Sequence, residues 1–177
     1  MKSLYILLVA LLMSSTAFAN FVGARVKVTG VTCSMCSNSV HKALSSLTFI
    51  EKIDVDLENA IFNLTFKEGQ HVEIDDIKNK IEGAGFSVGE LVADFKFENT
   101  SVSKDFHYEF DGSTYHFVGI KDQKLNEKVS LKFVDKGFTS PKEFKRYSAL
   151  TSMTCIKNGK PSTCCPASSK RIYHVTI

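Results

Sequence analysis

The sequence of 177 residues lacks tryptophan, has three prolines and carries little net charge. Its 22 basic residues are nearly matched by 19 acidic ones, which leaves a net charge of +3. A chain with so little excess charge has no extended basic surface, so we expect neither nucleic acid nor an anionic membrane among its partners. The prolines all lie beyond residue 140, and no proline-rich linker divides the chain.

Long apolar runs are scarce as well, and the one present lies at the N-terminus. It reads LYILLVALLM over residues 4–13, after Lys2 and before the small residues Ala17 and Ala19. This order is typical of a secretory signal peptide, which we expect at residues 1–19 with cleavage after Ala19. The run is shorter than the roughly 20 residues that a membrane-spanning helix needs. We therefore expect an exported protein with no transmembrane segment in its mature chain.

Residues 20–93 show the hydrophobic periods of strands and helices in turn. Val26 and Val28 alternate with Arg25 and Lys27, as in a half-buried strand. The same patterns predict helices around Val40–Leu47 and Ile74–Ile81, and further strands at 53–57, 62–66 and from Phe86 onward. The order β-α-β-β-α-β is that of an α+β ferredoxin-like sandwich, with two helices on one face of the sheet.

The C-terminal part, residues 94–177, has almost no helical period. Short alternating segments predict five or six strands, at 93–98, 104–110, 114–120, 128–134, 146–156 and 171–177. Residues 121–128 are expected to form a short helix or a polar loop. We predict a second, mainly antiparallel β domain, a small barrel or sandwich, whose role the sequence does not reveal.

A hairpin signal in this part leaves its register open. If the two-residue loop is Asp111-Gly112, His107 faces His116 across the strands. If the loop begins one residue later, Glu109 faces His116 instead. A histidine pair could bind a metal, whereas polar residues on the solvent face of a hairpin are the alternative interpretation.

The five cysteines fall into a close pair and a distant trio, and an odd number cannot all pair within one chain. Cys33 and Cys36 lie in GVTCSMC, between the first predicted strand and the first predicted helix. The N-terminus of a helix lowers the pKa of a nearby thiol. Two thiolates on a short loop suit Cu(I), and Hg(II) as well, whereas Zn(II) usually takes four ligands.

The stretch GVTCSMCSNSVHKAL, together with the predicted strand order and the GAGF before the last strand, resembles the heavy-metal-associated domain family over residues 22–92. The resemblance implies that Cys33 and Cys36 are the metal ligands. Phe86 matches the aromatic position that lies near the metal loop in this family, and we expect it to shield the site. Met35, between the cysteines, is interpreted as a spacer of the loop rather than a ligand.

These features together predict an exported, non-enzymatic carrier, chaperone or scavenger of Cu(I) in a bacterial periplasm. Its partner would be a metal-exchanging protein, such as a membrane transporter or an efflux component. Other interpretations remain open: a periplasmic Hg(II)-binding protein, a thiol–disulfide oxidoreductase that uses the Cys33–Cys36 pair, or a plain interaction module. A structural disulfide between Cys33 and Cys36 is a further alternative, since exported proteins retain disulfides.

The trio lies in SMTCIKNGKPSTCC, near the C-terminus. Its sulfur-bearing residues are Met153, Cys155, Cys164 and Cys165. One interpretation is a disulfide from Cys155 to Cys164 or Cys165, which ties a strand end to its loop. The other is a second soft-metal site built from these sulfurs.

Overall fold

The computed structural model describes residues 21–161, 164–165 and 170–177. The signal peptide expected at 1–19 lies outside these ranges. Within them, no helix combines the length and the apolar character that a membrane span requires.

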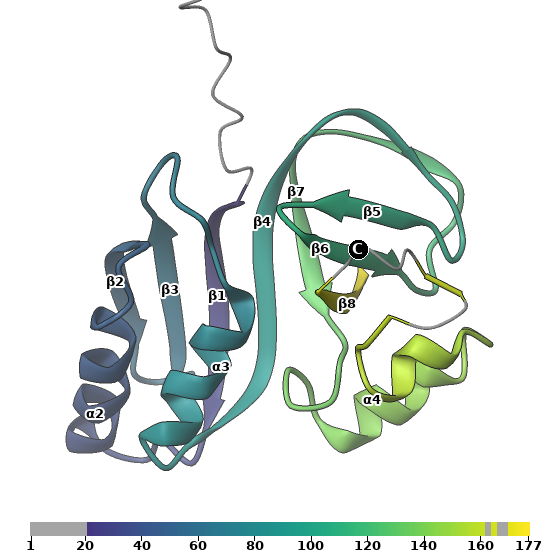
Figure 1. Ribbon diagram of the computed structural model, residues 1–177. Helices are drawn as coiled ribbons and strands as arrows, with labels where there is room; N and C mark the ends of the chain where they lie inside the picture. Colours follow the sequence, from purple (N-terminus) through teal and green to yellow (C-terminus); the bar gives the residue numbers. More distant parts are fainter. Residues whose placement is uncertain (1–20, 162–163, 166–169) are drawn as a thin grey trace, which may run out of the picture.

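The N-terminal half has the predicted βαββαβ order, shown in purple to teal in Figure 1. Its four strands are hydrogen-bonded in the order β2-β3-β1-β4, and both helices pack on one face of the sheet (Figure 1). The elements are β1 (Phe21–Thr29), α2 (Ser34–Ser45), β2 (Ile50–Asp56), β3 (Ile61–Phe66), α3 (Ile74–Gly83) and β4 (Ser87–Val102). The ferredoxin-like prediction is confirmed for this half.

Period-two burial explains why this half of the sheet has helices on one face only. Val26 and Val28 of β1 are buried, while Arg25 and Lys27 are exposed on the opposite face. Leu44 of α2 is fully buried, as are Ile77 and Ile81 of α3. Each completely buried Leu or Ile side chain contributes about 1.5–3 kcal/mol, so the apolar faces of both helices hold them against the sheet.

The C-terminal strands continue this sheet. Among the described residues all strands belong to one eight-stranded sheet, in the order β2-β3-β1-β4-β7-β8-β6-β5. β4 runs through the expected domain boundary at residue 93, and it pairs with β1 along one edge and with β7 along the other. The additional elements are β5 (His107–Phe110), β6 (Ser113–Phe117), β7 (Gln123–Phe133), α4 (Pro141–Ser148), η1 (Thr154–Lys157) and β8 (Arg171–Thr176).

Two local predictions for this half were wrong. The strand expected at 146–156 is instead the end of α4 followed by a loop and η1. The Ser140 hydroxyl caps α4 by accepting a hydrogen bond from the Glu143 backbone N–H, and Pro141 suits the first helical turn. The helix or loop expected at 121–128 is mostly the start of β7, which pairs with the long β4. Pairing with a distant strand thus decides the structure of a segment whose own sequence is polar.

An aromatic core joins the two halves around β4. The Phe95 ring lies 4.8 Å from that of Phe21 in β1 and 4.6 Å from that of Phe97, measured between ring centroids. It also contacts Tyr108 and Phe110 of β5, at 5.8 and 5.0 Å. The sheet therefore curls so that its last strand packs over β4.

The β5–β6 turn settles the register of the hairpin. Asp111 and Gly112 form the two-residue loop, with φ values of 51° and 77°. Two consecutive positive φ values are typical of the type I′ turn, whose twist matches that of the strands. His107 therefore pairs with His116, as one of the two predicted registers requires.

Replacing Phe95 with alanine tests whether the two halves unfold together. We expect the free energy of unfolding to fall by about 3–5 kcal/mol, because a fully buried ring that contacts strands of both halves is removed. Phe106→Ala, which truncates a partly buried ring, should cost clearly less. Denaturant unfolding followed by circular dichroism and by amide exchange of β3 and β8 checks this. Loss of protection in β8 while β3 stays protected would contradict it.

Candidate metal centre

The loop between β1 and α2 is shaped by a glycine. Gly30 has φ +91°, a conformation that side chains rarely adopt, and the Phe86 ring lies 3.6 Å from where a Cβ would be. Val31, next along the chain, is half-buried and packs against the hydrophobic core. The Phe86 ring and the core contacts of Val31 thus hold the loop in place. The residues that follow lie at the surface, at the start of α2.

Cys33 is the N-cap of α2. Its extended backbone precedes the first helical residue, and its sulfur accepts a hydrogen bond from the Cys36 backbone N–H at 3.2 Å. Cys33 is exposed, whereas Cys36, in the first turn of the helix, is half-buried. The two predicted ligands are therefore adjacent, with one open to solvent and the other set into the helix.

The electrostatics of this position favour a thiolate. The pKa of Cys33 is lowered from its ordinary value, first by a side-chain hydrogen bond with Cys36 and next by the Cys36 backbone N–H. The unpaired N–H groups and the positive end of the helix dipole act in the same direction. The exposed Cys33 thiol thus loses its proton more readily than an ordinary cysteine thiol.

A surface depression with partly apolar walls lies beside Cys33. A depression of about 450 Å³ is lined by Val31, Thr32, Cys33, Ser34, Leu57 and Glu58. Met35 and Leu57 are 78% and 58% exposed, unusually high values for apolar side chains. Phe86 is half-buried beside Gly30, under the loop. Cys33 is therefore accessible to a large partner as well as to a small ion.

The structure also brings the C-terminal trio together. Cys155 is buried in η1, and Cys164 and Cys165 are half-buried in the turn that follows. All five cysteines lie within the described residues, each as an unbridged thiol. The three sulfurs of the trio lie within 4.8 Å of one another. Met153 immediately precedes η1, and its backbone N–H donates to Thr151 Oγ1 at 3.1 Å.

Sequence reasoning missed His174 and Asp135. His174 lies in a segment predicted as a strand, but only the parallel pairing of β6 with β8 places it beside His116. Asp135 follows β7, and its carboxylate hydrogen-bonds His174 Nδ1 at 2.7 Å. A short-range pattern carries no signal for a parallel pairing of strands more than 50 residues apart.

Comparison with known proteins agrees with this geometry. The heavy-metal-associated domain profile matches residues 25–87. A copper-transporting ATPase of Helicobacter pylori is 34% identical over 71 residues, which are 40% of this chain and 9% of the ATPase. The chain thus spans less than a tenth of the length of that relative.

Two solved structures resemble the same segment. A copper-binding domain from HMA7, a P-type ATPase, is 39% identical, with coverage of 37% of this chain and 89% of that domain and a TM-score of 0.34. The CopZ metallochaperone is 28% identical, with coverage of 36% and 94% and a TM-score of 0.34. The profile match, together with the βαββαβ order, identifies residues 25–87 of this chain as a heavy-metal-associated domain.

Proposed function

We propose that this protein is an exported carrier of Cu(I), which Cys33 and Cys36 hold and a partner protein receives by thiolate exchange. The observation that carries the proposal is the N-cap position of Cys33, where an exposed sulfur accepts the Cys36 N–H. Copper-transporting ATPases and a metallochaperone among the relatives support the choice of metal. Soft sulfur ligands select Cu(I) over harder cations.

Ligand exchange follows from the unequal exposure of the two sulfurs. The Cys33 thiolate meets the incoming ion first, because its side chain is exposed and its pKa is lowered. Cys36 then gives up its proton to solvent and completes a two-sulfur site. A thiolate of the partner can add as a third ligand from the open side as one of the two bonds to this chain breaks, and a second partner thiolate then replaces the remaining cysteine. No bond within a substrate changes, so the proposed role is transfer rather than catalysis.

The exposed apolar side chains offer a docking surface for that exchange. Leu57 shares the hollow with Cys33, and Met35 projects from the loop between the two cysteines. A partner that covers them would bury apolar surface and exclude water from the sulfurs during transfer. A membrane transporter or efflux component that faces the periplasm fits the expected export of the chain.

Hg(II) is the second candidate cargo, because two thiolates alone also satisfy this soft ion. Thiol–disulfide exchange is a chemically different use of the same pair, since a cysteine with a lowered pKa three residues before another can attack a disulfide. Metal titration and an insulin-reduction assay on the same reduced protein separate these roles. Stoichiometric metal binding with negligible reductase activity supports the carrier.

The double variant Cys33→Ser, Cys36→Ser should lose about one equivalent of tightly bound Cu(I), because hydroxyls are poor ligands for this soft ion. The measurement is a competition titration of the fully reduced protein against a chromophoric Cu(I) chelator. Met35→Leu is the matched control: it removes the third sulfur of the loop, keeps its apolar bulk, and should bind as the unaltered chain does. Equal stoichiometry in the double variant and the unaltered chain would rule out this pair as the Cu(I) site.

Alkylation of Cys33 should follow a pH profile whose midpoint lies below that of an ordinary cysteine, because its pKa is lowered. Cys36→Ala should move the midpoint upward, since the side-chain hydrogen bond is the largest cause of the shift while the backbone N–H remains. Peptide-resolved mass spectrometry after timed alkylation provides the rates. An unmoved midpoint in Cys36→Ala would contradict this assignment of the cause.

A further inference from the structure

Three sulfurs converge beside β8, far along the chain from the Cys33–Cys36 pair. The Cys164 and Cys165 sulfurs lie 3.3 Å apart, and Cys155 lies with them in a group that spans at most 4.8 Å. Two sulfurs bound to one ion at about 2.3 Å can be no more than about 4.6 Å apart. The trio is therefore already close to the spacing that a single ion requires.

Three histidines form a row across neighbouring strands beneath these sulfurs. His107 of β5 pairs with His116 of β6, which pairs in parallel with His174 of β8. The first two rings stack at 4.4 Å, and the second and third lie 5.1 Å apart, between centroids. Strand pairing places all three imidazoles side by side, so their positions are set by backbone hydrogen bonds rather than by a loop.

Each imidazole presents a nitrogen to a sulfur. His174 Nε2 lies 3.3 Å and His116 Nδ1 3.7 Å from Cys155 Sγ. His107 Nε2 lies 3.4 Å from Cys165 Sγ. Cys155, His116 and His174 are fully buried. Sulfur and nitrogen donors are thus interleaved, with Cys155, His116 and His174 buried and His107, Cys164 and Cys165 half-buried.

Carboxylates orient the two buried histidines. Asp135 Oδ1 lies 2.7 Å from His174 Nδ1, and Asp105 Oδ1 lies 3.1 Å from His116 Nε2. A carboxylate only accepts hydrogen bonds, so these nitrogens are the donors, and the opposite nitrogen of each ring faces Cys155. A carboxylate behind an imidazole is the arrangement that usually supports a histidine ligand of a metal.

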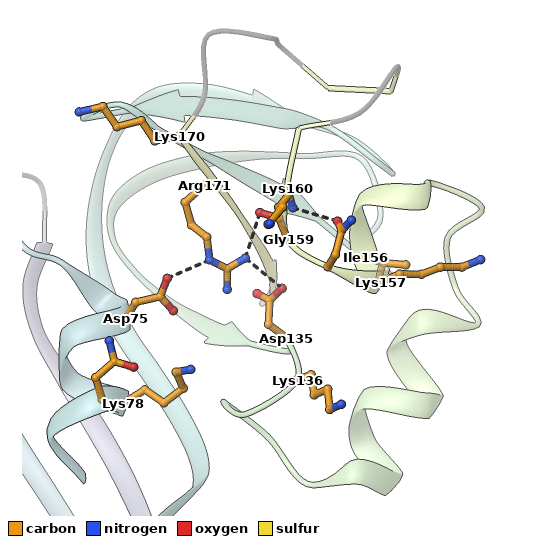
Figure 2. Close-up of a pocket in the computed structure, with 12 residues that line it drawn as sticks. Asp75, Lys78, Asp135, Lys136, Ile156, Lys157, Gly159, Lys160, Lys170 and Arg171 are labelled. Carbon is orange, nitrogen blue, oxygen red and sulfur yellow. Dashed lines mark hydrogen bonds and ion pairs between the residues drawn. The ribbon is translucent and has the colours of Figure 1, made fainter. Parts of the chain in front are cut away.

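Asp135 is itself held in place from the other side. Figure 2 shows Arg171 between Asp75 and Asp135, at the wall of a cavity of about 470 Å³. Arg171 Nε lies 2.9 Å from Asp75 Oδ2, and its Nη1 lies 3.8 Å from Asp135 Oδ1. The His174 backbone N–H also donates to Asp135 Oδ2 at 2.7 Å. The carboxylate behind His174 therefore has little freedom to turn away.

The two buried imidazoles meet at the Cys155 sulfur. His116 Nδ1 and His174 Nε2 both face this one atom, and a thiol has a single proton to donate. A cation between the sulfur and the two nitrogens would satisfy all three atoms at once.

We propose that Cys155, Cys164 and Cys165, together with the row of His107, His116 and His174, form a second metal site that takes a thiophilic d¹⁰ cation, Zn(II) or Cu(I). Three thiolates and an imidazole make the four-ligand set of a closed zinc site, and three thiolates alone suit Cu(I). This site is enclosed, whereas Cys33 is exposed, so the second ion is a resident of the fold rather than cargo. It links η1 and its following turn to β6 and β8.

The test uses the full chain with Cys33→Ser and Cys36→Ser, so that it does not depend on the carrier site. Reduced protein is titrated separately with Zn(II) and Cu(I), each against a competing chelator. About one equivalent of one ion should bind tightly, and adding Cys164→Ser and Cys165→Ser should abolish it. Both of these positions are only half-buried, so the variant keeps the buried Cys155. Met153→Leu, which removes a neighbouring sulfur, is the matched control and should bind normally.

Two further measurements distinguish ligands from structural residues. Asp105→Asn should weaken binding of the ion about 10- to 100-fold while the circular dichroism spectrum is unchanged, because it replaces the carboxylate behind His116 with an uncharged, weaker acceptor. Alkylation of Cys164 and Cys165, the half-buried members of the trio, should be blocked by the ion and restored by a chelator. The proposal is overturned if the Cys33→Ser, Cys36→Ser protein binds neither ion, if serine at 164 and 165 leaves binding intact, or if the ion leaves the alkylation rates of Cys164 and Cys165 unchanged.

Discussion

The structure depends on β4 being paired along both edges. Residues 87–95 of β4 pair with β1 and residues 91–102 pair with β7, so a single strand belongs to the βαββαβ unit and to the C-terminal strands at once. Backbone hydrogen bonds are directional and must be satisfied when buried. The position of the C-terminal strands relative to the Cys33–Cys36 loop is therefore set by a ladder of such bonds and by the rings around Phe95.

The two groups of sulfurs show how burial decides what a thiol site can do. At the start of α2 an exposed sulfur needs only the helix N-terminus to become a thiolate, and any partner can approach it. Cys155 is completely buried, and burial raises the pKa of its thiol, so a thiolate there needs a cation beside it. Exchange suits the first position and retention suits the second, although both use the same chemical group.

The sequence predicted best where a short-range period determines the structure. The alternation of Val26 and Val28 with Arg25 and Lys27, and the spacing of Ile77 and Ile81, were enough to identify the N-terminal fold. The CxxC motif before a helical period also predicted that Cys33 and Cys36 lie at the start of a helix, where the structure has them. The sequence did not predict the long-range pairing of strands. β7 begins in a polar segment because that segment pairs with β4. α4 begins where the Ser140 side chain caps it. Two features align the three histidines: the Asp111-Gly112 turn and the parallel pairing of β6 with β8. Only the turn has a recognisable sequence pattern.

Alternation along β8 connects the histidine row to the βαββαβ unit. Arg171 and Tyr173 point toward α3: Arg171 contacts Asp75, and the Tyr173 hydroxyl donates to Glu73 Oε1 at 2.6 Å. His174, between Tyr173 and the strand's end, points to the opposite face and meets Cys155. Burial raises the pKa of Tyr173, which keeps its hydroxyl protonated as the donor to Glu73. Successive side chains of β8 point to opposite faces of the sheet. An ion bound at the trio would therefore stabilise β8 and, through it, the contacts with the first turn of α3.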